Sequence, residues 1–144
     1  MQDDQTQEPK LMQLSIPRGW AIGDNKFYDV DPIKSNEPDS NFIDNSLLGF
    51  IEDTLWLFEW RYEHDQDGKT QMVIPKTNCY SIDLGWYPDA DFTGEYYAKL
   101  FWDGSERITV DKLSSRSRYE IRKKIEQWME DIMANYKEAH SRFL

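Results

Sequence analysis

Aspartate residues two positions apart recur along the chain, and they are the side chains best suited to acid–base or metal chemistry. The pairs are Asp29 and Asp31, Asp65 and Asp67, and Asp89 and Asp91. Two neighbouring carboxylates can act as general acid and general base, and clustered carboxylates attract hard cations such as Ca²⁺. Because the chain has 27 Asp and Glu residues, pairs at this spacing also arise by chance. A solvated acidic surface is therefore the default interpretation.

Few other side chains are typical of catalytic or metal centres. His64 lies beside a predicted turn and His140 near the end of a predicted helix, and nothing near His64 in the sequence suggests a nucleophile or an orienting partner. Cys79 has no recognisable base and is expected to be a buried thiol. The stretch HDQDGKT starts like a calcium loop, but it lacks a third ligand position and the glutamate that should follow its glycine. The sequence has no CxxC, HExxH or glycine-rich phosphate loop, so we expect no enzymatic activity, no metal and no cofactor.

The charge of the chain is negative and unevenly distributed. Its net charge is −10, from 27 acidic and 17 basic residues. Residues 1–110 hold 21 acidic and 9 basic residues (net −12), whereas residues 111–144 hold 6 and 8 (net +2). An acidic surface repels phosphate backbones and speeds association with a basic protein. One basic cluster fits either a nucleic acid or a contact with the acidic part of the same chain: Arg116, Arg118, Arg122, Lys123 and Lys124.

Alternating side chains predict several β-strands. In residues 55–62, LWLFEWRY, every second position is aromatic, namely Trp56, Phe58, Trp60 and Tyr62. Single-strand binders use such a stripe to stack bases beside basic residues. Because the neighbours here are acidic, we expect the stripe to pack in the core under a helix. Further strands are predicted over 11–17, 20–30 with an interruption near 23–25, 72–74, 80–86, 96–102 and 108–110.

The end of the chain changes to helical periodicity. Apolar residues recur at intervals of three and four over 117–140, and Ser117 and Glu120 match a capping box at the start of this segment. Strands followed by one helix, without βαβ alternation, predict an α+β fold: a mostly antiparallel sheet of about five to seven strands with the helix packed on it. We expect a single domain over residues 11–144, after an acidic N-terminal tail of residues 1–10.

The sequence gives no signal for export or for membrane insertion. Its apolar stretches are far shorter than the ~20 residues of a membrane-spanning helix. The N-terminus, MQDDQTQEPK, lacks the basic and apolar segments of a secretory signal. A single cysteine cannot form an internal disulfide, in agreement with a reducing compartment. We expect a cytoplasmic protein.

Four segments together resemble the cytosolic immunity proteins of bacterial contact-dependent growth inhibition systems. They are GWAIGDNKFYDVDP (19–32), FIEDTLWL (50–57), YSIDLGWYPDADFTGEYYAKL (80–100) and the capped terminal helix, and FYDVDP and DLGWYP carry most of the resemblance. It covers roughly residues 17–129. The resemblance implies a protein without catalytic activity that binds, one to one, the toxic C-terminal domain of a cognate delivered protein. Such toxins are frequently nucleases with basic surfaces, and the fold type has been compared with single-strand DNA-binding Whirly domains.

No single residue can be assigned to toxin binding from the resemblance. From chemistry alone, we expect exposed carboxylates in or near loops to pair with lysines or arginines of the toxin: Asp29, Asp31, Asp39, Asp44, Asp65, Asp67, Asp89 and Asp91. Tyr28 and Tyr87 are candidate aromatic anchors, and partial core burial is an equal alternative for both. Two other functions stay open: a nucleic-acid-binding domain that uses the aromatic stripe and the basic cluster, and a hydrolase that uses paired aspartates.

Overall fold

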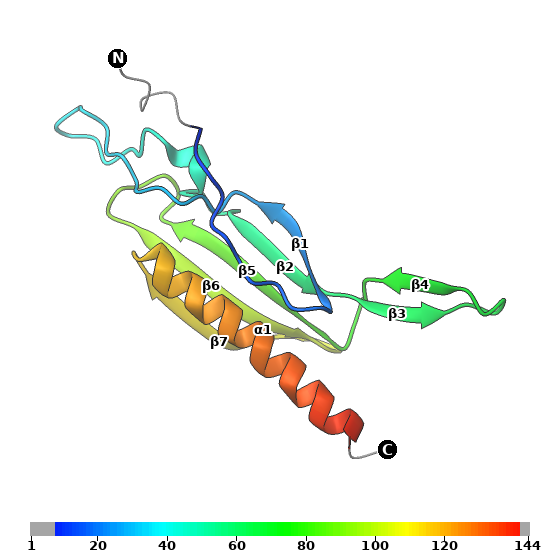
Figure 1. Cartoon of the computed structure of the whole chain (residues 1–144). Coiled ribbons are helices and arrows are strands. Elements are labelled where there is room, and N and C mark those ends of the chain that lie inside the picture. Colours follow the sequence, from blue (N-terminus) through cyan, green and yellow to red (C-terminus); the bar gives the residue numbers. More distant parts are fainter. Residues whose placement is uncertain (1–7, 142–144) are drawn as a thin grey trace.

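The computed structural model describes residues 8–141, with side chains as far as residue 136. Residues 1–7 of the predicted tail and the side chain of His140 lie outside this part. The elements are β1 (Trp20–Asn25), the 3-10 turn η2 (Ser46–Leu48), β2 (Leu55–Glu59), β3 (Arg61–His64), β4 (Thr70–Val73), β5 (Cys79–Tyr87), β6 (Glu95–Asp103), β7 (Arg107–Ser115) and α1 (Arg118–Ser141). The predicted α+β class is confirmed, because one antiparallel sheet in the order β1-β2-β5-β6-β7 packs against the C-terminal helix (Figure 1).

One face of the sheet, which we call the helix face, forms the core with α1. The register aligns Leu57 of β2 with Ile82 of β5, and Ile82 with Leu100 of β6. These side chains are buried against a stripe of α1 that includes Ile125 and Met129, both with no accessible surface. The apolar periodicity of residues 117–140 therefore predicted the buried side of the helix correctly.

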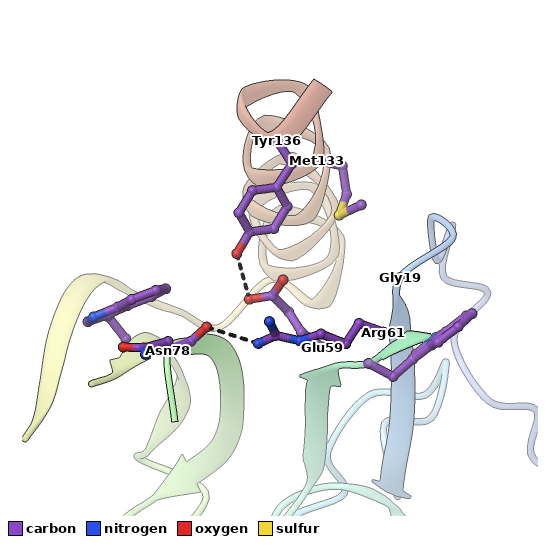
Figure 2. Close-up of a pocket in the computed structure, with 8 residues that line it drawn as sticks. Gly19, Glu59, Arg61, Asn78, Met133 and Tyr136 are labelled. Atoms are coloured by element: carbon purple, nitrogen blue, oxygen red, sulfur yellow. Dashed lines mark hydrogen bonds between the residues drawn. The ribbon is translucent and has the colours of Figure 1, made fainter. Parts of the chain in front are cut away.

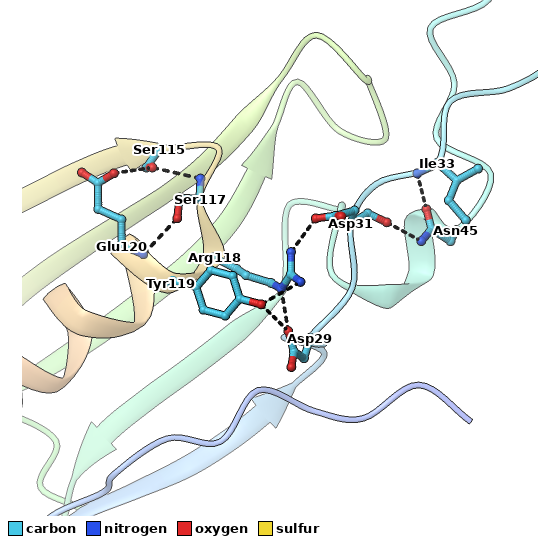
Figure 3. Close-up of polar contacts among 9 residues, drawn as sticks. All are labelled: Asp29, Asp31, Ile33, Asn45, Ser115, Ser117, Arg118, Tyr119 and Glu120. Atoms are coloured by element: carbon cyan, nitrogen blue, oxygen red, sulfur yellow. Dashed lines mark hydrogen bonds and ion pairs between the residues drawn. The ribbon is translucent and has the colours of Figure 1, made fainter. Parts of the chain in front are cut away.

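The start of α1 uses half of the predicted capping box. The Glu120 N–H donates to Ser117 Oγ at 3.2 Å, which satisfies one free backbone donor of the first turn. The Glu120 carboxylate accepts from Ser115 Oγ at 2.9 Å, and the Ser117 N–H donates to the same Ser115 oxygen at 3.0 Å (Figure 3). Ser115 thus takes the place that the glutamate has in a complete capping box.

The predicted strand over residues 55–62 is divided between two sheets. Pairing with β5 ends at Phe58, and after Trp60 the chain pairs instead with β4, where Arg61 lies opposite Val73. The resulting two-stranded hairpin β3–β4, which we call the arm, extends away from the main sheet (Figure 1). Its turn at residues 65–69 confirms the turn that was predicted beside His64.

Trp56 and Phe58 of the aromatic stripe do not pack under the helix, so that prediction is wrong for them. Leu55 and Leu57 point to the helix face and are buried, whereas Trp56 and Phe58 point to the opposite face. No helix lies on this opposite face within residues 8–141 (Figure 1), and we call it the open face. The helix face is already filled by large rings such as Trp86 and Tyr96, so it accommodates the leucines of β2 rather than its larger aromatic side chains.

The segment 11–17 was expected to be an edge strand and is not one. It makes a single isolated bridge, between Leu11 and Tyr28. Met12 is buried in the core, and the Ser15 N–H donates to Glu126 Oε2 of α1 at 2.7 Å. The segment therefore runs beside α1 and covers the part of the helix face that the helix leaves open.

Candidate functional site

The open face carries a row of aromatic side chains. The register aligns Phe58 of β2 with Ser81 of β5, and Ser81 with Phe101 of β6, and Tyr97 lies on the same face of β6. Trp56 is 45% exposed, and its ring centroid lies 4.6 Å from that of Phe58. Accessible aromatic side chains that gather on one face are typical of an interaction surface.

Gly23 of β1 lets the two rings of β2 lie close to the sheet. A Cβ atom at Gly23 would be 2.5 Å from Cε3 of Trp56 and 3.2 Å from Cε1 of Phe58. Any larger residue would therefore have to push the indole aside. The glycine of the sequence GDN thus fixes the position of Trp56 on the open face.

Three carboxylates, which we call the acidic margin, border Trp56. Asp24, Asp53 and Asp83 line with it a cavity of about 250 Å³. Desolvation raises the pKa of Asp83 above its ordinary value, and the charge of Asp53 raises it further. Within the described residues, the acidic margin has one ion pair, between Lys26 Nζ and Asp24 Oδ2 at 3.8 Å. A guanidinium or ammonium group in this cavity would meet carboxylates and the face of an indole at once.

The other half of the open face is basic. Lys99 of β6 lies over the ring of Tyr97 at 4.8 Å. Arg107 of β7 lies over the ring of Phe101 at 4.7 Å and pairs with Asp103 at 2.5 Å. Most cations of the open face thus lie on β6 and β7, and Lys99 is directly opposite Asp83 of the acidic margin.

Two of the predicted site residues, Asp29 and Asp31, are hydrogen-bonded within the chain (Figure 3). Arg118, at the start of α1, donates from Nε to Asp29 Oδ1 at 2.7 Å and from Nη1 to Asp31 Oδ1 at 2.6 Å. The Tyr119 hydroxyl donates to the same Asp29 oxygen at 3.3 Å. The hydrogen bond from Arg118 lowers the pKa of Asp29, against a smaller effect of desolvation. We call this group the Arg118 clamp, and it realises the intramolecular contact that the basic cluster allowed.

Three further predicted carboxylates accept hydrogen bonds from backbone N–H groups. Asp65 Oδ1 accepts from the N–H groups of Asp67 and Lys69 at 2.9 and 2.8 Å, which closes the turn of the arm. Asp89 accepts from the Glu52 N–H at 2.8 Å. Asp91 accepts from the N–H and the hydroxyl of Thr93, and these hydrogen bonds lower its pKa. These side chains thus have structural partners.

The predicted carboxylates do not gather in one place. Asp39, Asp44 and Asp67 are exposed, with no side-chain hydrogen bond within residues 8–136. Asp65 and Asp67 belong to the turn between β3 and β4, at the tip of the arm, and the other six belong to the segments 26–45 and 88–94. These two segments lie at the opposite end of the sheet from the arm (Figure 1). The loops are joined there by bridges between Lys34 and Ile43 and between Phe42 and Asp91. One partner surface cannot centre on both ends.

The two predicted tyrosine anchors differ in their surroundings. Tyr28 is half-buried beside Leu11. Tyr87 is 39% exposed on the open face, with its ring centroid 6.2 Å from that of Tyr97. Burial raises the pKa of Tyr87, and the nearby carboxylates of Asp83 and Glu52 add to the shift. Tyr87 is therefore continuous with the aromatic row, and its role as an anchor stays a prediction.

His64 and Cys79 are the two other residues considered for catalysis, and each has surroundings of its own. The His64 ring contacts the Thr70 hydroxyl at 3.1 Å on the exposed arm. Cys79 is buried, and desolvation raises the pKa of its thiol, as do the charges of Asp103 and Glu59. Within residues 8–136, no three His, Cys, Asp or Glu side chains are placed to hold a metal ion.

The acidic margin was missed by the sequence analysis, although a signal for it was present. Residues 80–86 alternate between large apolar side chains and Ser81, Asp83 and Gly85. The apolar side of this strand must face the core, and in the sheet it matches Leu55 and Leu57. Two of the aromatic positions of residues 55–62, Trp56 and Phe58, therefore share a face with Asp83.

No protein-family model, curated protein or solved structure matches this chain. The resemblance to immunity proteins thus stays a prediction. Within residues 8–141, no helix has both the length and the apolar character needed to cross a bilayer.

Proposed function

We propose that the chain is an immunity protein of a contact-dependent growth inhibition system, which binds and neutralises a basic toxin domain in the cytoplasm. It acts as a one-to-one inhibitor without catalytic turnover. The resemblance over residues 17–129 and the net charge of −10 both favour this class of protein.

One observation supports the proposal most directly. The exposed indole of Trp56 lies on an uncovered sheet face and shares a cavity with the three carboxylates of the acidic margin. Binding hot spots combine a large aromatic side chain with charged groups that lose water on binding. Lysines and arginines of a nuclease, which contact phosphates in its own substrate, match these carboxylates in charge.

Inhibition follows if the open face covers the substrate groove of the toxin. The carboxylates would replace the substrate phosphates as partners of the toxin's cations, and Trp56 would pack on the aliphatic part of one of them. Asp89 and Tyr87 border the same face and extend the contact. The exposed loop residues Asp39 and Asp44 would add long-range attraction.

The test is co-expression with the toxic C-terminal domain of the delivered protein encoded beside this chain. Cells should survive, and the tagged chain should recover that domain at low salt and progressively less at high salt. Killing despite co-expression, or recovery of nothing at low salt, would contradict the proposal.

A second function is favoured by the exposure of the aromatic row. Single-strand binders stack bases on such rows beside basic residues, and Lys99, Arg107 and Lys112 share the open face. The basic cluster at the helix start lies on the other side of the sheet, and its Arg118 is already paired. A band shift with single-stranded DNA or RNA at low salt would favour this function over the first.

A further inference from the structure

A buried carboxylate, that of Glu59, lies outside the surface proposed above. Glu59 is the last residue of β2, points to the helix face opposite Trp20, and is 8% exposed. Its Oε1 accepts from the Tyr80 N–H at 2.5 Å and from the Tyr136 hydroxyl at 3.2 Å. Desolvation raises the pKa of Glu59, against the effect of these hydrogen bonds. Ionising a carboxyl in this environment costs free energy.

The fold does not need a charge at this position. Both donors point at one oxygen, and the amide oxygen of glutamine would accept from them equally well. The second oxygen, Oε2, has no hydrogen bond within residues 8–136. An ionisable side chain here is therefore best explained by a ligand.

A cavity lies directly against the Glu59 carboxyl. It has a volume of about 400 Å³, and its walls are largely apolar, with Trp60, Trp102 and Met133 among them. Figure 2 shows Tyr136 and Met133 reaching down from α1 toward Glu59. A second cavity of about 410 Å³ shares Trp60 and Met133 with the first and continues to the base of the arm at Tyr62. Together they form a groove, and Glu59 lines its first part only.

The chemistry of the walls selects the class of ligand. Indole faces attract cations, and Glu59 would pair with a cation and repel an anion. A neutral apolar ligand would leave Oε2 of Glu59 without a hydrogen bond. A metal ion would need several oxygen ligands, and the described residues offer no group of three.

We propose that this pocket binds an organic cation with an apolar stem, either the side chain of a lysine or arginine or a free alkylamine. The head group pairs with Glu59, and the stem lies along the indole and thioether walls. Arg61 also lines the pocket, and its positive charge opposes the binding of a cationic ligand. Its guanidinium is held on the wall by the Asn78 carbonyl at 3.3 Å, and it forms no ion pair within residues 8–136 (Figure 2).

The test is an NMR titration of the full chain with n-butylammonium chloride, observing the indole N–H signals of Trp60 and Trp102. Both signals should shift with a dissociation constant on the order of 1 mM, while the signal of Trp56 on the open face should not. Titration with 1-butanol and with sodium chloride provides the neutral and the ionic control. Equal shifts with 1-butanol would overturn the proposal. So would the absence of a shift when the n-butylammonium concentration is about fifty times the expected dissociation constant.

Variants separate the charge from the shape of the pocket. Glu59→Gln keeps both hydrogen bonds and should weaken binding at least about tenfold, whereas the exposed control Glu106→Gln should leave it unchanged. Arg61→Gln removes a positive charge that repels the cationic ligand, so it should strengthen binding a few-fold. A Glu59 with only a structural role would not produce this result. Unchanged affinity in both pocket variants would overturn the proposal.

A second probe distinguishes the two sources of the cation. Nα-acetyl-lysine methylamide carries the same head group on a peptide backbone. Binding as tight as that of n-butylammonium would identify a protein side chain, and weaker binding would identify a free amine. These probes need no protein partner, so they test the pocket whether or not a toxin is found.

Discussion

Both faces of the sheet carry aromatic rings, but only the rings of the helix face are fully buried in the core. Trp20, Trp86 and Tyr96 on the helix face are at most 3% exposed, and Trp86 and Tyr96 pack edge to face. Trp56 on the open face is 45% exposed. Aromatic content therefore does not distinguish core from binding surface until the strand register is known.

The carboxylates differ in the same way. The carboxylates of Asp29 and Asp31 form ion pairs with Arg118 in the Arg118 clamp. Those of the acidic margin surround an accessible indole, with Lys26 at 3.8 Å from Asp24 and Lys99 opposite Asp83 in the register, and neither forms a hydrogen-bonded clamp. Net charge alone would have treated all of them as equal parts of a binding surface.

The largest expected difference between the faces is in stability. Leu57→Ala leaves a cavity in the core and should lower the free energy of unfolding by about 3 kcal/mol. Trp56→Ala, one position earlier on the other face, should lower it by under about 1 kcal/mol. Urea unfolding measures both, and similar losses for the two variants would show that the open face is covered.

A double-mutant cycle tests how Trp56 is positioned. Gly23→Ala should cost about 2 kcal/mol, because the new methyl group would be 2.5 Å from the indole. In the Trp56→Ala background the same substitution should cost much less, with a coupling energy above about 1 kcal/mol. Additive losses would mean that the strain at Gly23 does not involve Trp56.

The Arg118 clamp should have a smaller effect that depends on pH. Arg118→Gln should destabilise the protein by about 1 kcal/mol at pH 7, whereas Lys123→Gln, which removes an exposed cation of the same helix with no ion pair within residues 8–136, should change stability little. Asp29 has a pKa below its ordinary value of 3.8. Its stabilisation is therefore present above that value and is lost as the pH falls through the lowered pKa. A difference between Arg118→Gln and the unmodified chain that does not shrink as the pH falls below 3.8 would contradict this.

Glu59 should show the opposite sign. Because its pKa is raised, the folded state binds its proton more tightly than the unfolded state does, so stability falls as the pH rises above its ordinary value of 4.5. Glu59→Gln should therefore be slightly more stable than the unmodified chain at pH 8, by under about 1 kcal/mol. Thermal unfolding between pH 4 and pH 8 measures this, and lower stability of the variant at pH 8 would contradict it.

Periodicity predicted most of the fold. The alternation in residues 80–86 and the three-and-four spacing after Ser117 are local signals, and both elements form where expected. The break at Trp60 could not be predicted, because the aromatic alternation continues through it while the pairing partner changes from β5 to β4.

The candidate site was less predictable because it depends on contacts between distant residues. Asp29 and Asp31 meet Arg118, which lies 89 and 87 positions away in the sequence. The acidic margin draws on three separate segments of the chain. A list of exposed aspartates contains no information on which of them the fold will pair.

The most direct measurement is a calorimetric titration of the toxin domain with two charge-matched variants. Asp24→Asn with Asp53→Asn removes two charges from the acidic margin, and Glu106→Gln with Glu130→Gln removes two exposed charges elsewhere. If the open face is the binding surface, the first pair should weaken binding at least about tenfold, or 1.4 kcal/mol, and the second less than about twofold. Equal losses in the two pairs would contradict a specific role of the open face, because they would show that net charge alone governs binding.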